Sequence, residues 1–340
     1  MSVDAAARRR RLWRVLGAAS VLLLLAGLVA GGEGWSLRAF GALLQGPDAA
    51  LVIGQIRAPR TLGAWLTGAL LGLAGALAQG LFRNPLADPF LLGSASGASF
   101  AVVAVLAAGS LIGLPVLGTT AAGMLSQVGL VAAAFAGALG GVLLTLMLAR
   151  GAQHTLRLLL AGVVVGVVLS ACSDLLTLAA PEALRGRQVF MLGSTGFLGW
   201  HSCALLALGL VLTLPLALRL SRALDALVLG EDSARSLGLA LPRLRLLLVC
   251  LLAAATGLAV SQAGLVAFVG LAAPHLVRRY APGRHGPMLW GSALAGAVLL
   301  LAADVAARSL IAPQELPVGV LTAVFGGIYL LWLLHRRRDA

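Results

Sequence analysis

The chain lacks lysine and carries few charged residues of any kind. All 25 basic residues are arginine, they stand against 12 acidic residues, and charged residues make up 11% of the 340. Soluble proteins carry roughly 25%. The absence of lysine excludes a P-loop, whose phosphate-binding lysine is required, and a Schiff-base lysine. We therefore expect any ATP hydrolysis that this protein uses to occur in another chain.

Cysteine is scarce, and paired catalytic groups are missing from the sequence. The three cysteines are scattered through apolar segments and predict neither a disulfide framework nor a metal cluster. The five histidines are isolated and share no metal-ligand spacing. Asp174 is the one acid that we place inside a membrane span, near its outer end, where it either has a functional role or faces water. The sequence thus predicts no catalytic residue, no metal site and no cofactor bound by this chain.

Long uncharged runs dominate what is present. Hydrophobic residues make up 60% of the chain, and a run of about 18 residues is long enough to cross the roughly 30 Å hydrocarbon layer. Several such runs occur, so a single cleaved signal peptide does not explain them. The net charge of +13 lies in short loops between the runs, where it sets membrane orientation and does not indicate nucleic-acid binding. The sequence predicts an all-α polytopic membrane protein, with residues 1–340 forming one transmembrane domain.

We expect about ten transmembrane helices with both termini in the cytoplasm. Arginine clusters in the N-terminal segment 1–14 and at 336–338 set that orientation. A short similarity between 75–80 and 257–264, on spans expected to run in opposite directions, indicates either an inverted repeat or coincidence in a glycine-rich chain. The expected spans are 15–32, 61–82, 90–110, 118–149, 157–180, 195–218, two pieces of 246–277 divided near 261–264, 286–306 and 316–334.

Three arginines oppose the inward bias of positive charge. Arg57 and Arg60 flank Pro59 at the outer end of the second span, and Arg308 lies at the outer end of the ninth. We expect them to form ion pairs with acidic residues of an extracytoplasmic partner. Anchoring in the lipid headgroups is the alternative, and for Arg308 so is an ion pair with Asp304, four residues earlier.

The segment R-N-P-L-A-D-P at 83–89 predicts a rigid turn at the inner mouth between two spans. Its two prolines exclude a continuous helix. A small, weakly polar face follows directly. It either packs tightly against a neighbouring helix or lines a wide pathway. The residues concerned are Gly93, Ser94, Ser96 and Gly97.

The inner loop 219–245 is the longest charged stretch inside the chain. Glu231 and Asp232 predict the first turn of a short helix, where carboxylates suit the helix dipole, and Gly238 is placed to end it. Leu227 and its neighbours give the preceding piece an apolar face, which predicts a second short helix. Two such helices indicate a docking element for a soluble partner, and a solvated connecting loop is the alternative.

Taken together, these segments resemble a known family: the permease subunits of ATP-binding-cassette importers for iron siderophores, haem and cobalamin, of the FecCD type. The similar strings occur in family order through nearly the whole chain. Each string is weak alone, but the ordered set is specific. They are R-A-P-R at 57–60, R-N-P-L-A-D-P at 83–89, L-L-G-S-A-S-G-A at 91–98, L-L-L-A-G at 158–162, M-L-G-S at 191–194, L-G-E-D-S-A-R-S-L-G at 229–238, F-V-G-L-A-A-P-H-L-V-R at 268–278 and E-L-P-V-G at 315–319.

The resemblance implies the inverted-repeat fold of a type II ABC importer permease in the bacterial inner membrane. It implies a homodimer with the substrate path at its axis, two cytoplasmic ATPase subunits that use ATP and Mg²⁺, and a periplasmic binding protein. The substrate would be a bulky metal chelate, either an iron chelate (siderophore or haem) or, as the alternative, cobalamin. The permease itself would not be an enzyme. Phe190 departs from the pattern, which often has Trp there, so the outer gate is expected to differ.

The resemblance also implies roles for individual residues. Arg57, Arg60 and Arg308 match positions that dock the binding protein. The other matches are Asn84, Leu86 and Thr155 at a cytoplasmic gate, Gly93, Ser94, Ser96 and Gly97 on the translocation path, and Leu227, Glu231, Asp232 and Arg235 in the loop that couples to the ATPase.

Two other classes compete with this interpretation. An ion-coupled secondary transporter needs acids or unwound ion sites within the membrane, and Asp174 is the sequence's only candidate. An intramembrane enzyme needs paired catalytic groups, which the sequence does not offer.

Overall fold

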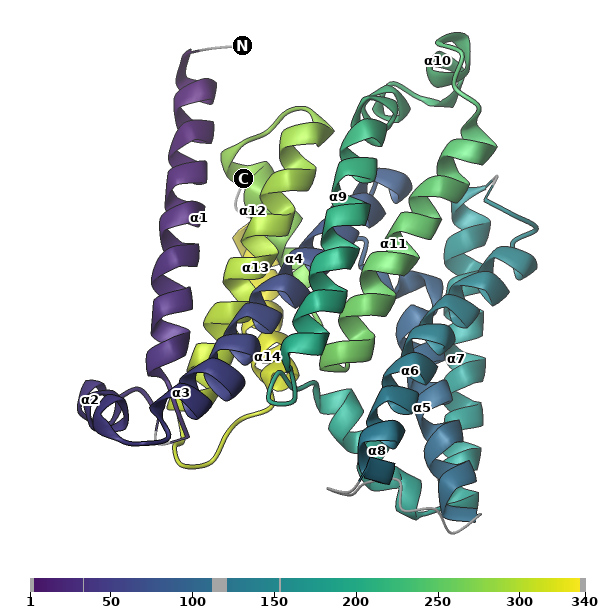
Figure 1. The fold of residues 1–340 in the computed structure, drawn as a ribbon. Coiled ribbons are helices and arrows are strands. Elements are labelled where there is room, and N and C mark those ends of the chain that lie inside the picture. Colours follow the sequence, from purple (N-terminus) through teal and green to yellow (C-terminus); the bar gives the residue numbers. More distant parts are fainter. Residues whose placement is uncertain (1–2, 33, 112–120, 153, 337–340) are drawn as a thin grey trace.

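The fold is a bundle of ten main helices joined by short ones (Figure 1). The computed structural model describes residues 3–32, 34–111, 121–152 and 154–336. The connecting elements are α2 (Leu37–Gln45), α3 (Ala49–Leu51), the π-helix η1 (Val52–Arg57), the 3-10 helix η2 (Pro89–Leu92), α8 (Glu182–Leu192) and α10 (Glu231–Ser236). The main helices are α1 (Val3–Val29), α4 (Ala58–Phe82), α5 (Ser94–Leu111), α6 (Ala121–Leu148), α7 (Thr155–Ala179), α9 (Trp200–Val228), α11 (Leu241–Ala263), α12 (Val269–Tyr280), α13 (His285–Ser309) and α14 (Val318–Arg336).

Each expected span corresponds to one of these helices. Among the described residues, seven helical segments are long and apolar enough to cross a membrane, and α5 and α14 contain shorter apolar helices. Helix α12 has 12 residues, which span only about 18 Å at 1.5 Å per residue. It is the short piece expected within 246–277.

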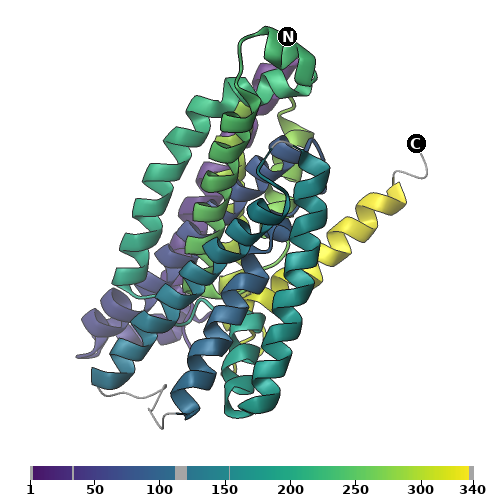
Figure 2. The ribbon, with the colours of Figure 1, turned by 90° about the vertical axis from the view of Figure 1, so that its right-hand side faces the viewer.

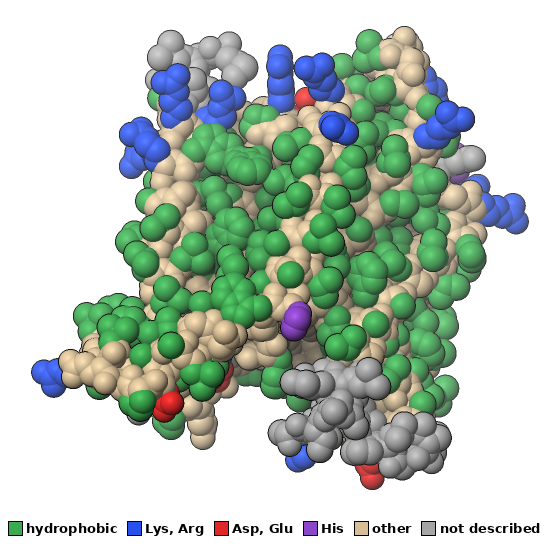
Figure 3. All heavy atoms as spheres, viewed as in Figure 1, with side chains coloured by type: hydrophobic (Ala, Val, Ile, Leu, Met, Phe, Trp, Pro, Cys, Tyr) green, Lys and Arg blue, Asp and Glu red, His purple; other side chains and the backbone are tan. Residues whose placement is uncertain are grey.

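The chain alternates between two ends of the molecule. Both termini lie at the end that carries α10, whereas α2, α3 and α8 lie at the opposite end (Figures 1 and 2). In the space-filling view, most arginine side chains gather at the α10 end (Figure 3). This asymmetry fits the positive-inside pattern predicted from the sequence.

Helix α4 forms the centre of the bundle, and nearly all its residues are buried. It packs against α9, α11, α12 and α13. Glycines allow these helices to approach closely. If Gly72 carried a Cβ atom, it would lie 2.0 Å from the carbonyl oxygen of Ser292, and a Cβ on Gly75 would lie 1.6 Å from that of Gly270, so no larger residue fits. Membrane helices approach each other in this way because packing, and not a hydrophobic force between helices, drives their association.

The break between α11 and α12 lies where the sequence predicted it. Gly264 and Phe268 both have positive φ angles, 69° and 67°, and the residues between them are not helical. Backbone groups that have no partner within a helix here form hydrogen bonds with a neighbouring segment. The amide of Ser194 donates to the carbonyl of Ala263, and the amide of Leu265 donates to the carbonyl of Phe190. Non-helical backbone at membrane depth requires such partners inside the protein.

The outer helices present apolar side chains to their surroundings (Figure 3). On α7, Leu160, Val167 and Leu178 are all at least 60% exposed, and α1, α9 and α14 carry similar exposed side chains. Apolar surface this extensive suits a lipid environment or a partner helix and not water. The fold is therefore that of an integral membrane protein.

Candidate functional site: the two ends of a path

At the end opposite α10, a buried acid joins three segments of the chain. Asp304 on α13 is fully buried and accepts hydrogen bonds from Arg60 Nε at 3.1 Å and from Thr195 Oγ1 at 2.5 Å. It also pairs with Arg308 one turn further along α13. Arg60 also forms an ion pair with Glu315, whose carboxylate lies 2.9 Å from Arg60 Nη1. From the sequence, Asp304 could be recognised only as an alternative partner of Arg308, because Arg60 and Thr195 lie far from it along the chain.

Two of the outer arginines cap the end of α1. Arg308 Nη1 donates to the carbonyl oxygens of Gly27 and Ala30 at 2.9 and 3.1 Å. Arg57 Nη1 donates to Leu28 and Val29 at 3.0 and 2.9 Å. The last carbonyls of a helix have no partner within it, and cations suit the negative end of the helix dipole. The two guanidinium groups thus attach α1 to α4 and α13.

The expectation for Arg308 therefore needs correction. Its side chain is 3% exposed and is engaged by Asp304 and α1, so in this conformation a partner cannot reach it. The alternative, an ion pair with Asp304 on the same helix, is confirmed. Arg57 is half-buried and the Arg60 side chain is 11% exposed, so docking through these two residues stays a prediction.

At the α10 end, the expected turn follows α4. Arg83 ends the helix with φ of 50°, and Asn84 Oδ1 accepts the amide of Leu86 at 2.9 Å. Asn84 and Leu86 are exposed. Thr155 begins α7, which packs against η2 just beyond the turn. The three residues matched to the gate thus lie on neighbouring elements, and their role in gating stays a prediction.

The small face after this turn packs against a helix. A Cβ on Gly97 would lie 2.1 Å from the carbonyl oxygen of Gly137, and one on Gly141 would lie 2.3 Å from that of Gly93. Ser94 is fully buried, while Ser96 is half-buried. Of the two alternatives predicted for this face, tight helix packing therefore applies to Gly93, Ser94 and Gly97. The backbones of α5 and α6 are in direct contact at these glycines. Ser96 lies toward Gly166 of α7, and its place on a path stays a prediction.

Two adjacent glycines of α6 test this packing. Gly141→Ala should destabilise the folded permease by about 1–3 kcal/mol, because the new methyl group overlaps backbone that cannot move aside like a side chain. Gly140→Ala should be neutral or stabilising, because nothing lies within 4 Å of its Cβ position and alanine favours helix. Thermal denaturation in detergent compares the two. Equal melting temperatures would show that α5 and α6 are not packed as described.

The inner loop contains one short helix and not two. Helix α9 continues to Val228, so the expected first helix is its last turn. Leu227 is 2% exposed and packs in the core, which corrects its assignment to a docking surface. Val228, Leu229 and Leu237 are each over 60% exposed and provide the apolar surface instead. Gly238, with φ of 81°, ends the turn after α10 as predicted.

Glu231 holds α10 in place through three arginines. Its carboxylate lies 2.5 Å from Arg245, 3.4 Å from Arg235 and 3.6 Å from Arg83. Burial alone would raise the pKa of Glu231, but the hydrogen bond from Arg245 and the charges of Arg245, Arg83 and Arg235 outweigh it and lower the pKa. The group is therefore ionised at neutral pH. Asp232 is 99% exposed and is free to face a partner protein.

The ion pair of Glu231 with Arg83 connects the two inner elements. Arg83 is the residue directly before Asn84, so the loop helix α10 and the predicted gate turn are joined by one salt bridge. Sequence reasoning placed the loop and the turn at the same membrane face without joining them. Both Arg83 and Arg245 were missed because each is distant from Glu231 in the sequence.

Asp174 is exposed at the surface of the described structure, and its contact with water stays a prediction. Its side chain is 65% exposed and lies 2.5 Å from Arg187 on α8. The described residues therefore give it the environment of a surface ion pair and not that of an ion-binding acid in the membrane.

The fold and its two polar ends define a class of protein: a helical integral membrane protein with several candidate membrane spans and a polar cluster at each end. The model of the FecCD transport family matches residues 19–336. The vitamin B12 import system permease protein BtuC of Salmonella typhi is 40% identical over 333 residues, which cover 96% of each chain. The Fe(3+) dicitrate transport system permease protein FecD of Escherichia coli K12 is 38% identical over 287 residues, covering 84% of this chain and 86% of FecD.

A solved structure agrees with these relatives. An inward-facing metal-chelate type ABC transporter superposes with a TM-score of 0.81 at 28% identity, covering 95% of this chain and 99% of the other. PsaBC from Streptococcus pneumoniae shares the fold with a TM-score of 0.56 at 17% identity. The chain belongs to the FecCD transport family.

Proposed function

We propose that this protein is the membrane permease subunit of an ATP-driven importer for a bulky metal chelate. The observation that carries the proposal is the Glu231–Arg83 pair, which ties the exposed loop helix α10 to the turn at the inner end of α4. A partner that moves α10 would move that turn. The chain itself has no phosphate-binding lysine, so two separate ATPase subunits would supply the movement.

The arrangement of the chain supports an orientation. The α10 end, which carries both termini and most arginines (Figure 3), would face the cytoplasm of a bacterium, and the inner membrane would surround the bundle. The ATPases would contact Val228, Leu229 and Leu237 beside the exposed Asp232 and Arg235. The exposed apolar face of α7 would meet a second copy of the chain across the substrate path.

The substrate class follows from the relatives. FecD is named for ferric dicitrate and the solved neighbour for metal chelates, which supports an iron chelate as the substrate. BtuC is named for vitamin B12 and covers more of the chain, which supports cobalamin as the second candidate. Both are bulky, so both suit the same permease architecture.

Uptake by reconstituted vesicles tests this function. Vesicles containing the permease, its ATPase and its binding protein should accumulate either a labelled ferric chelate or labelled cobalamin, and the other should not compete at equal concentration. Accumulation of neither compound, with all three proteins shown to be assembled, would reject the proposed substrate class.

The outer face is expected to bind the delivery protein through Arg57 and Arg60. Arg57→Gln and Arg60→Gln should each weaken binding about tenfold, and more at low salt, because ion pairs at an interface rim are screened by salt. Arg38→Gln is the control, since Arg38 is exposed on α2 at the same end. Unchanged affinity of both variants at low ionic strength would remove these residues from the docking surface.

A further inference from the structure

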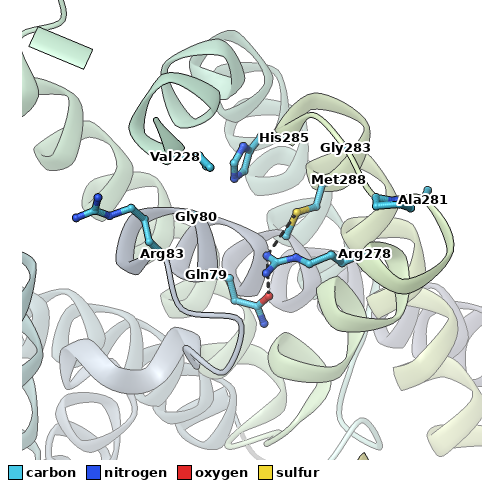
Figure 4. A pocket seen from close by; sticks show the side chains of 10 residues that line it. Gln79, Gly80, Arg83, Val228, Arg278, Ala281, Gly283, His285 and Met288 are labelled. Carbon is cyan, nitrogen blue, oxygen red and sulfur yellow. Dashed lines mark hydrogen bonds between the residues drawn. The ribbon is translucent and has the colours of Figure 1, made fainter. Parts of the chain in front are cut away.

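A pocket lies at the α10 end, where four membrane helices terminate. It is bounded by the last turns of α4, α9 and α12 and the first turn of α13, and its volume is about 420 Å³. Its lining includes Gln79, Arg83, Val228, Arg278, His285 and Met288 (Figure 4). These residues come from three separate stretches of the chain, which is why no sequence motif marks the site.

Arg278 is the main charge of this pocket. Its side chain is half-buried, and Nη2 lies 3.3 Å from Gln79 Oε1 and 3.7 Å from Met288 Sδ. Both partners are neutral. Within the described part of the chain, Arg278 forms no ion pair with a carboxylate, in contrast to Arg245, which is paired with Glu231. A half-buried guanidinium with only neutral partners is a position that an anion would stabilise.

The other polar groups leave this charge uncompensated. His285 donates its amide to Asp225 Oδ1 at 2.8 Å, and its Nδ1 lies 2.7 Å from the same oxygen. Asp225 is therefore engaged with His285, whose Nε2 lies near Gly80 in the pocket. Arg83 extends away from Arg278 (Figure 4) and contacts Glu231 at 3.6 Å. Both neighbouring carboxylates are thus engaged by other side chains, and among the described residues neither forms an ion pair with Arg278.

We propose that the pocket binds a phosphate group, with Arg278 as its main ligand and Gln79 and His285 beside it. A guanidinium presents paired N–H donors that match phosphate oxygens. The pocket lies at the ends of membrane helices, which is the depth of lipid headgroups. Basic pockets between helices on the cytoplasmic side are typical sites for anionic headgroups. The phosphate would belong to an anionic lipid or to a soluble phosphate compound. The evidence for this phosphate site is the pocket itself, so the proposal does not depend on which substrate the protein transports.

Two measurements on the purified permease separate these sources. Native mass spectrometry, with phosphatidylglycerol as the probe, should show lipid retained by the wild type and about tenfold less by Arg278→Gln. Arg279→Gln is the matched control, since it removes the same charge one residue further along α12, where the side chain lies over Trp332. Arg278→Lys should retain part of the lipid. Inorganic phosphate in detergent tests the soluble source through a saturable rise in the melting temperature that Arg278→Gln abolishes.

Each outcome decides the proposal. Loss of lipid retention alone assigns the site to a headgroup, and loss of the phosphate effect assigns it to a soluble phosphate. If Arg278→Gln and Arg279→Gln behave alike in both measurements, with the Lys variant folded, the site does not bind phosphate. If instead only assembly with the ATPase is weakened by Arg278→Gln, the pocket receives an acidic segment of a protein, and the proposal is overturned.

Discussion

Replacing Asp304 with asparagine should destabilise the folded permease by about 3–5 kcal/mol, the usual cost of removing one partner of a buried ion pair. Asp304 is fully buried and accepts from Arg60, Arg308 and Thr195. Without its charge, Arg308 remains buried, with only neutral oxygens, those of the new amide and of backbone carbonyls, as hydrogen-bond acceptors. The expected result is a fall in the melting temperature in detergent, together with early loosening of α1, because Arg308 also caps that helix.

Glu315→Gln provides the control for this prediction. Glu315 pairs with the same Arg60, but its side chain is 38% exposed, so its loss should cost about 0–1 kcal/mol. The double variant Asp304→Asn with Arg308→Gln should cost less than the sum of the single changes, because the two charges are coupled. Additive costs would show that the pair does not act as one unit.

The second large effect is expected at Glu231, and it should be larger on function than on folding because Glu231 is 31% exposed, whereas Asp304 is fully buried. Glu231→Gln removes the carboxylate that three arginines share. We expect the permease to remain folded in the membrane while uptake falls about tenfold or more, within the range of allosteric coupling energies. ATP hydrolysis by the assembled partner should continue. Parallel measurement of hydrolysis and uptake in the same vesicles shows the separation.

Arg83→Gln isolates the link between α10 and the turn. It removes only the contact at 3.6 Å and leaves Arg245 and Arg235 on Glu231. This variant should show the same uncoupling in weaker form. Asp174→Asn, which breaks an exposed pair at the other end of the molecule, is the matched control and should transport normally. If Arg83→Gln transports normally while Glu231→Gln does not, the effect of Glu231 acts through another route.

Much of the fold could be predicted because membrane spans depend on local composition. Uncharged runs and flanking arginines located the ten segments, and the arginines at both ends of 246–277 required the chain to cross out and back there, which located the break near Gly264. The boundaries of α9 could not be predicted in this way. Its last two turns contain Arg222 and Asp225, so the charge pattern ends the span before the helix ends.

The site residues were predicted less completely, because contacts between distant segments decide their environments. R-A-P-R and R-N-P-L were correctly predicted to lie at opposite ends of one helix, α4, and their roles as the two ends of a path stay predictions. The burial of Arg308 and Leu227 depends on helices that pack over them, α1 in one case and the bundle core in the other. The tight approach of Gly93 and Gly97 to α6 was one of two alternatives that the residues left open. Asp304 was predicted only as an alternative partner of Arg308, and no role was predicted for Arg278, because their other contacts come from neighbours far away in the sequence.

A measurement of which energy source drives uptake tests most directly the claim that this protein is the permease of an ATP-driven importer. Vesicles containing the permease and its binding protein are prepared with and without the ATPase, and uptake is measured with ATP on the α10 side or with an imposed proton or sodium gradient. Our account predicts uptake only when the ATPase and ATP are both present, with no response to the gradients. Uptake driven by an ion gradient in vesicles without the ATPase would contradict it and would identify a secondary transporter.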